Sequence, residues 1–161
     1  MRGFESRSRH MISKFLVFNR DRIEKEPAHE ALHVIVSIQS PKDPQLPRLN
    51  TNRHTLKVVR LVFHDMDDMH KRALPPEEWA KYEDDCFSLA HARQIVEAVR
   101  MHPEAEELLV HCDAGFSRSP AVAAALSKAL TGDDKSFFRR YSPNMRVYRT
   151  LLEAWHASTG G

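Results

Sequence analysis

The sequence has little cysteine and little glycine, and it contains no long apolar run. Only 2 of its 161 residues are cysteine and only 5 are glycine. Two cysteines without paired or metal-ligand spacing exclude a disulfide scaffold and favour a reducing compartment, where thiols stay free. No apolar run reaches membrane-spanning length, and no charged-then-apolar leader resembles a signal peptide. These absences predict a cytoplasmic protein without a membrane span.

An excess of charge of either sign is also missing. The 24 Lys and Arg residues nearly balance the 22 Asp and Glu residues, and the resulting net charge of +2 does not by itself predict nucleic-acid binding. With 42% hydrophobic and 29% charged residues, the composition is typical of one soluble domain with its own core. We predict this domain over residues 11–161. Residues 1–10 are rich in arginine and serine and are expected to be a disordered basic tail, or an addition ahead of a natural start at Met11.

Short β-branched, apolar segments alternate with longer amphipathic ones. The apolar segments predict strands over 13–18, 32–38, 55–63 and 107–111. Three prolines predict a surface loop over 40–52. Helices are expected over part of 19–30 and over 75–101, 121–130, 135–141 and 142–156. The alternation predicts an α/β fold, with one three-layer domain whose central, mostly parallel sheet of four to five strands is flanked by helices.

One helix in this plan is unusually long. Pro75 and the acidic residues after it are good start signals for a helix that runs to about Met101. Apolar side chains recur along it at helical spacing and are expected to pack one face on the sheet: Trp79, Tyr82, Cys86, Leu89, Val96 and Val99. Within this stripe Cys86 is expected to be a small core residue, or alternatively a resolving thiol.

Residues 108–120 combine a buried strand, a tight loop and the start of a helix. In the loop, Cys112 and Arg118 enclose five residues. A loop of this kind points backbone N–H groups inward, and the helix N-terminus adds further donors and a positive dipole end, so an anion is favoured. The fork of Arg118 suits two phosphate oxygens, and the same positive field favours the nucleophilic thiolate of Cys112. The loop is therefore predicted to bind and attack a phosphate.

The pattern His111-Cys112-x-Ala114-Gly115-x-Ser117-Arg118-Ser119 resembles the signature of the cysteine-dependent protein tyrosine phosphatases, and most closely that of the dual-specificity branch. The segment over 142–153 is similar to the last helix of that branch, so the resemblance covers about residues 11–157. It implies a phosphatase without a cofactor or metal that forms a cysteinyl-phosphate intermediate. The implied substrate is a phosphoprotein, with phosphotyrosine first and phosphoserine or phosphothreonine after it.

The resemblance also implies roles for single residues of the loop. Cys112 is the nucleophile, and Arg118 stabilises charge on the phosphate oxygens together with backbone N–H groups. Ser119 is expected to ease the departure of the sulfur, and His111 to hold the loop and keep the thiol ionised. Asp113 is expected to face outward, because a carboxylate aimed at phosphate would be repelled. The implied phosphate-binding residues are Asp113, Ala114, Gly115, Phe116, Ser117 and Arg118.

Three aspartates follow the third predicted strand, near the sheet edge where α/β proteins bind ligands. Such a reaction needs a general acid to protonate the leaving group. Asp65 is the expected acid because it lies nearest the strand end, and Asp67 and Asp68 are the alternates. The tyrosine-specific members carry a Trp-Pro-Asp sequence that this chain lacks, so the choice depends on placement alone.

Other functions stay open at this point. His64 and Asp65 form an adjacent pair that, with further ligands, would suit a metal-dependent phosphohydrolase. A loop that binds phosphate without catalysis would make a non-catalytic module, and the same loop in the wider superfamily acts on phosphoinositides and RNA 5′ ends. Five basic residues are candidates for a rim that binds polyanions, or else for a solvated helix face: Lys135, Arg139, Arg140, Arg146 and Arg149.

Overall fold

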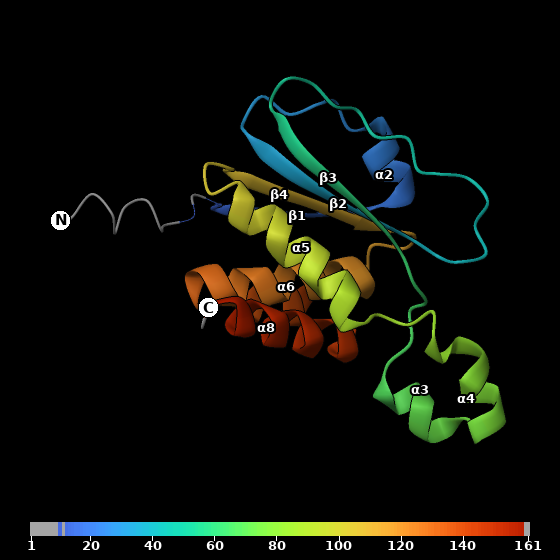
Figure 1. Cartoon of the computed structure of the whole chain (residues 1–161). Coiled ribbons are helices and arrows are strands. Elements are labelled where there is room, and N and C mark those ends of the chain that lie inside the picture. The colour runs from blue at the N-terminus through green and yellow to red at the C-terminus, as the bar shows by residue number, and fades with distance from the viewer. Residues whose placement is uncertain (1–9, 11, 160–161) are drawn as a thin grey trace.

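The computed structural model describes residue 10 and residues 12–159 (Figure 1). Most of the predicted tail over 1–10 therefore lies outside the described residues. The strands are β1 (Lys14–Asn19), β2 (His33–Gln39), β3 (Thr55–Val62) and β4 (Glu107–Cys112). The helices are α2 (Arg20–Lys25), α3 (Asp68–Ala73), α4 (Pro76–Glu83), α5 (Leu89–Met101), α6 (Arg118–Thr131), α7 (Lys135–Arg140) and α8 (Met145–Thr159).

The four strands form one sheet in the order β1-β4-β2-β3, and all their pairings are parallel. The α/β class and the central parallel sheet are thus confirmed. The two central strands, β2 and β4, are buried along their whole length, as expected where both sheet faces are covered. Because the strands are parallel, their carboxyl ends meet at one edge, and this edge receives the loop that follows Cys112.

Helices α5, α6 and α8 cover one face of the sheet, and α2 with the long loop over 40–54 covers the other (Figure 1). The larger core lies under the three helices and includes Val36, Phe63, Ile95, Leu126 and Leu151. A smaller cluster under α2 consists of Ile23, Ile35 and Leu109. Alanines on α6 allow this helix to approach the sheet closely, which fixes its N-terminus beside the end of β4.

The prediction of a single helix over 75–101 is wrong. The segment forms two helices, α4 and α5, separated by residues 84–88. A capping box starts α5: the Ser88 hydroxyl accepts from the backbone N–H of His91, and the His91 ring accepts from the backbone N–H of Ser88. Cys86 is buried in the break, while Leu89 of the predicted stripe is 38% exposed.

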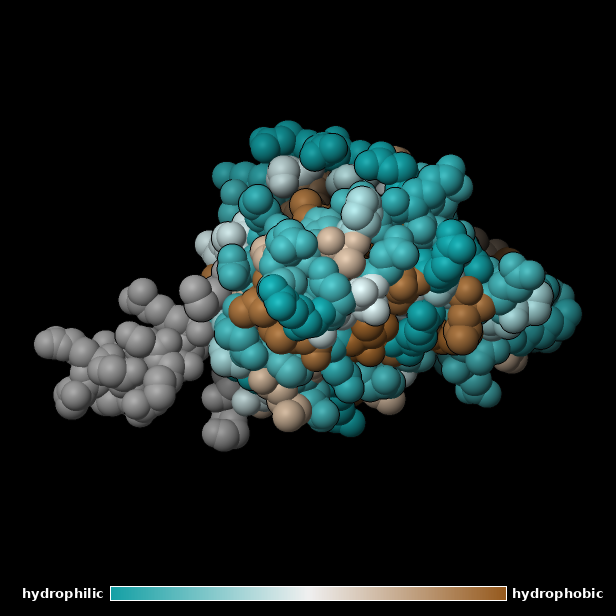
Figure 2. Space-filling model, turned by 90° about the horizontal axis from the view of Figure 1, so that it is seen from above, coloured by the Kyte–Doolittle hydropathy of each residue, from teal (hydrophilic) through white to brown (hydrophobic). Residues whose placement is uncertain are grey.

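Viewed from the side of α2 and the long loop, the surface is mostly hydrophilic, with hydrophobic residues scattered over it (Figure 2). Among the large apolar side chains of the described residues, Leu46 and Val62 are well exposed. Isolated exposed apolar side chains are ordinary on folded proteins and do not indicate a partner. In the described part of the chain, no helix has both the length and the apolar character needed to cross a membrane.

Candidate active site

The loop between β4 and α6 depends on one glycine. Gly115 has a φ of +69°, a conformation that L side chains rarely adopt. A Cβ at this position would lie 2.8 Å from the backbone nitrogen of Asn19, at the end of the neighbouring strand. The conformation and the available space therefore both require glycine, and the loop can curl tightly enough to place the Gly115 N–H 3.3 Å from the sulfur of Cys112.

The sulfur of Cys112 is surrounded by donors. The backbone N–H groups of Gly115 and Ser119 donate to it at 3.3 and 3.4 Å. The Ser119 hydroxyl lies 3.1 Å away and is fully buried, and Cys112 itself is 2% exposed. Two backbone donors and a hydroxyl that can also donate therefore converge on the sulfur of Cys112.

Arg118 begins α6 and is held from one end of its guanidinium group. Its Nη1 donates to the carbonyl oxygen of Phe63 at 2.8 Å and to the hydroxyl of Ser40 at 3.2 Å. Its Nη2 donates to Asp113 at 3.3 Å. The Nε–H is buried and has no hydrogen-bond partner among the described residues. The guanidinium is thus fixed in place with a donor still available to an anion in the loop.

The side chain of Asp113 is partly exposed and also bonds to two neighbours. Its carboxylate accepts a hydrogen bond from the Ser40 hydroxyl at 2.8 Å and pairs with Arg118, although its side chain is still 37% exposed. The neighbouring guanidinium attracts this carboxylate. Asp113 and Ser40 together hold the orientation of Arg118.

His111 is fully buried and lies between two hydrogen-bond partners. Its Nδ1 is 3.4 Å from the carbonyl oxygen of Cys112, and its Nε2 is 2.6 Å from the hydroxyl of Ser37. Burial lowers the pKa of His111 to about 4, so the ring is neutral at pH 7. Since a carbonyl only accepts, Nδ1 carries the hydrogen and Ser37 donates to Nε2. As a neutral ring, His111 holds the end of β4 and brings no positive charge to the thiol.

The structure brings Asp65 to the loop. The Oδ1 atom of Asp65 accepts a hydrogen bond from the Ser117 hydroxyl at 2.8 Å and another from the Asn144 amide at 2.9 Å. Within the described part of the chain, no hydrogen bond involves its Oδ2 atom. Asp65 therefore lies at the rim of the loop over 112–118, which we call the phosphate loop after its predicted ligand, with Oδ1 anchored and Oδ2 available.

The other two aspartates belong to α3, a helix that occupies part of the segment expected to be an acidic loop. Asp67 caps α3 and accepts hydrogen bonds from the backbone N–H groups of Met69 and His70, and its Oδ1 lies 2.9 Å from Nδ1 of the His70 ring. Burial alone would raise the pKa of Asp67, but the hydrogen bonds from His70 and Met69 lower it below its usual value. Asp68 is an exposed residue of the first turn. Neither side chain bonds to the phosphate loop among the described residues.

Asn144 contacts the candidate site, although the sequence did not predict it there. It is 4% exposed and precedes α8, and its amide donates to Asp65 and to the carbonyl oxygen of Met66. The Ser-Pro-Asn sequence is an ordinary signal for the start of a helix, and Asn144 does cap α8 by accepting from the N–H of Val147. Capping alone is enough to explain an asparagine before α8, so nothing in the sequence indicated its contacts with Asp65 and Met66.

The structure gives no support to a metal site at His64. Among the described residues, no group of three or more His, Cys, Asp and Glu side chains is placed to hold a metal ion. The His64 ring packs edge-on against Tyr82 with 5.2 Å between ring centroids, and its backbone N–H donates to Asp85. The hypothesis of a metal-dependent phosphohydrolase thus lacks a ligand set in this part of the chain.

Aromatic as well as basic residues lie at the rim of the loop. Phe116 is 53% exposed, and its ring meets that of Tyr141, which in turn lies under the guanidinium of Arg140. Arg146, one of the predicted rim cations, instead donates to the carbonyl oxygen of Phe87 at 2.9 Å. Of the predicted rim cations, Arg140 therefore lies beside the rim aromatics, whereas Arg146 is bonded to the backbone of Phe87.

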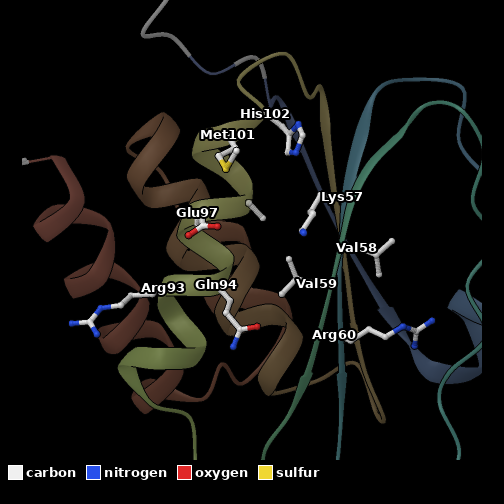
Figure 3. Close-up of a pocket in the computed structure, with 10 residues that line it drawn as sticks. Lys57, Val58, Val59, Arg60, Arg93, Gln94, Glu97, Met101 and His102 are labelled. Atoms are coloured by element: carbon white, nitrogen blue, oxygen red, sulfur yellow. The ribbon is translucent and has the colours of Figure 1, made fainter.

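A separate hollow lies between β3 and α5 (Figure 3). Lys57 and Glu97 point toward it from opposite sides, while Arg60 points away to the other face of the sheet. The residues that line the hollow include none of the phosphate loop. The hollow is thus distinct from the site built around Cys112.

Comparison with known proteins identifies the fold. No family model matches the sequence, and no curated protein matches it either. Among solved structures, a variant of human DUSP28 superposes with a TM-score of 0.53 at 19% identity, over 94% of this chain and 95% of that one. PTPMT1 in complex with PI(5)P gives 0.52 at 15% identity, over 94% and 96%. The human tyrosine phosphatase-like serine/threonine/tyrosine-interacting protein gives 0.50 at 15%, over 94% and 97%.

These similarities extend over nearly the whole of each chain. The chain therefore has the fold of the dual-specificity and tyrosine phosphatases, and the fold that the signature around Cys112 implied is confirmed. Identities of 15 to 19% establish the fold alone.

Proposed function

We propose that this chain is a cysteine-dependent phosphatase that hydrolyses phosphomonoesters, with phosphotyrosine proteins as the first candidate substrates. The observation that carries the proposal is the unpaired, buried Nε–H of Arg118 in the same loop as the donor-surrounded thiol of Cys112. A buried donor without a partner is costly. This donor lies at the N-terminus of a 14-residue helix, where anions are favoured, and a phosphate oxygen would accept its hydrogen bond.

In the first step, the Cys112 thiolate attacks phosphorus and an S–P bond forms. The bond between phosphorus and the ester oxygen breaks, and the leaving oxygen takes a proton from the carboxyl group of Asp65. Arg118 and the backbone N–H groups of the loop stabilise charge on the three other phosphate oxygens. The free Oδ2 of Asp65 is the oxygen suited to deliver the proton, because Oδ1 is already bonded twice.

In the second step, water attacks phosphorus and the S–P bond breaks. The Asp65 carboxylate takes a proton from the water, inorganic phosphate is released, and the thiolate is restored. The Ser119 hydroxyl, 3.1 Å from the sulfur, donates to the thiolate as negative charge returns to it. Each group thus ends the cycle in the protonation state in which it began.

The central test is hydrolysis of an aryl phosphate by wild type and by Cys112→Ser. Wild type is expected to turn the substrate over in the presence of a metal chelator. The variant should still bind inorganic phosphate, seen as thermal stabilisation, but lose turnover by on the order of a thousandfold or more, because a serine hydroxyl is a far weaker nucleophile. Turnover that survives in the variant would contradict the mechanism.

The substrate class is tested by a panel of phosphotyrosine, phosphoserine and phosphothreonine peptides, phosphoinositides and RNA 5′ ends. We expect the phosphotyrosine peptides to give the highest kcat/KM. A higher kcat/KM for phosphoinositides or RNA ends would contradict the proposed protein substrate but not the proposed cysteine mechanism. Phosphate binding without turnover of any compound would identify a non-catalytic module instead.

A further inference from the structure

Asn144 joins three segments that lie far apart in the sequence. Its side-chain Nδ2 donates to Oδ1 of Asp65 at 2.9 Å and to the carbonyl oxygen of Met66 at 3.1 Å. Its backbone N–H donates to the carbonyl oxygen of Ser117 at 3.0 Å. Its side-chain Oδ1 accepts from the N–H of Val147 at 3.1 Å, in the first turn of α8. The acid segment, the phosphate loop and the last helix therefore meet at one buried amide.

The orientation of this amide is set by its neighbours. The backbone N–H of Val147 can only donate, so the atom that faces it must be the oxygen of the Asn144 side chain. The nitrogen then faces the Asp65 carboxylate and the Met66 carbonyl, which both accept. All the hydrogen-bonding capacity of the amide nitrogen is thus directed at the segment that carries Asp65.

A helix cap alone does not require asparagine. Capping needs one acceptor, which serine and aspartate supply about equally well. Only an amide combines that acceptor with two N–H donors on the same side chain. The contacts to Asp65 and Met66 therefore account for the amide at this position beyond its capping role.

We infer that Asn144 is a positioning residue which holds Oδ1 of Asp65 and so leaves Oδ2 as the oxygen that carries and delivers the proton. This inference rests on the proposed function. An oxygen that already accepts two hydrogen bonds, here from Ser117 and Asn144, is a poor place for a proton, because the proton would meet both donors. Asp65 is an exposed residue, so without Asn144 only the Ser117 hydroxyl would orient its carboxyl group.

The contacts also close a ring of three residues. Ser117 donates to Asp65 through its hydroxyl and accepts from Asn144 through its carbonyl, while Asn144 donates to Asp65. The separation between the acid and the phosphate loop is thus held from two sides. Proton transfer depends steeply on this separation, so a loosened ring lowers the rate before it lowers substrate binding.

The test uses Asn144→Ser and Asn144→Asp, which both keep an acceptor for the α8 cap and lose the amide donor. Each variant is assayed with phenyl phosphate, whose leaving group needs a proton, and with para-nitrophenyl phosphate, whose leaving group needs it far less. We expect kcat/KM for phenyl phosphate, which reports the steps up to loss of the leaving group, to fall by about tenfold to a hundredfold, and kcat/KM for the nitrophenyl ester to change little. In Asn144→Asp, the added charge beside Asp65 should also move the basic limb of the pH–rate profile to higher pH.

Three controls separate the outcomes. Asp65→Asn should show the same dependence on the leaving group, and adding Asn144→Ser to it should cause no further loss, because the two residues act through one proton. Thermal melts show whether each Asn144 variant stays folded, and Asn144→Ser introduces no charge. If wild type is active and the folded Asn144 variants show the same leaving-group dependence and pH profile as wild type, this inference is overturned and the proposed function stands. A wild type without Cys112-dependent turnover would overturn the proposed function and the inference together.

Discussion

Gly115 and Gly132 both have a positive φ, but their surroundings differ. A Cβ on Gly115 would lie 2.8 Å from the backbone of Asn19, whereas a Cβ on Gly132 meets no atom within 4 Å. Gly132→Ala should therefore cost only the strain of the left-handed conformation, about 1 kcal/mol in the free energy of unfolding, and leave kcat/KM unchanged. Gly115→Ala adds a backbone clash that the phosphate loop must move to relieve, so it should lower stability further and abolish turnover.

Chemical denaturation and the aryl phosphate assay on both glycine variants check this prediction. Gly132→Ala serves as the matched control, because it shares the positive φ and lies outside the loop. A Gly115→Ala variant that retained wild-type turnover would show that the loop can recover its shape without glycine.

Residues of the site were predictable where the chemistry is contiguous in the sequence. Cys112 and Arg118 stand in one loop between a strand and a helix, so their types and spacing were sufficient to bring them together. The amide of Asn144 reaches Asp65 across 79 positions, and no local pattern contains such a contact. The hydrogen bond between Asp113 and Ser40, which follows β2, was not predicted for the same reason, since it spans 73 positions.

At the scale of elements, the strand ends were predicted to within about one residue, because each strand is a short apolar run bounded by polar residues. The helices were less certain, because their ends depend on single capping residues. The start of α5 shows the difficulty. Its capping box uses histidine at the third position, in place of the usual Glu or Gln, and the apolar residues on either side continue the helical spacing through the break.

This capping box can be tested by Ser88→Ala. The substitution removes the acceptor for the His91 N–H and should lower the free energy of unfolding by about 1 kcal/mol. Because Ser88 makes no hydrogen bond to the phosphate loop among the described residues, kcat/KM for an aryl phosphate should not change. Denaturant titrations and steady-state kinetics measure the two quantities. An unchanged midpoint and slope of the denaturant curve would mean that the buried Phe87, and not the capping box, fixes the break between α4 and α5.

At the scale of the whole molecule, several histidines couple stability to pH in opposite directions. Burial lowers the pKa of His10, His91 and His111, with Arg100 adding to the effect at His10. A group with a lowered folded pKa resists protonation in the native state, so the unfolded chain binds more protons as the pH falls. These three histidines therefore destabilise the fold progressively below about pH 6.5, and His111 continues to do so down to its pKa of about 4.

His29 acts in the other direction. Its Nδ1 lies 2.6 Å from Glu107 of β4, and its Nε2 lies 2.8 Å from Glu26, just after α2. Burial alone would lower the pKa of His29, but the hydrogen bonds and charges of the two carboxylates raise it above its usual value. The stabilisation from the protonated ring is thus fully present below the unfolded pKa of about 6.5, and it is lost as the pH rises through the higher folded pKa.

The opposing groups predict a stability maximum near neutral pH, and His29→Gln isolates the alkaline side of it. The variant should lose stability relative to wild type at about pH 6, where the imidazolium of wild type pairs with both carboxylates, and the difference should shrink by about pH 9. Denaturant unfolding over this range measures it. His54→Gln is the matched control, since the ring of His54 lies 4.0 Å from a Glu30 side chain that is 92% exposed, and such a contact contributes little to stability. Parallel curves for wild type and His29→Gln would mean that the link from α2 to the central strand does not depend on the charge of His29.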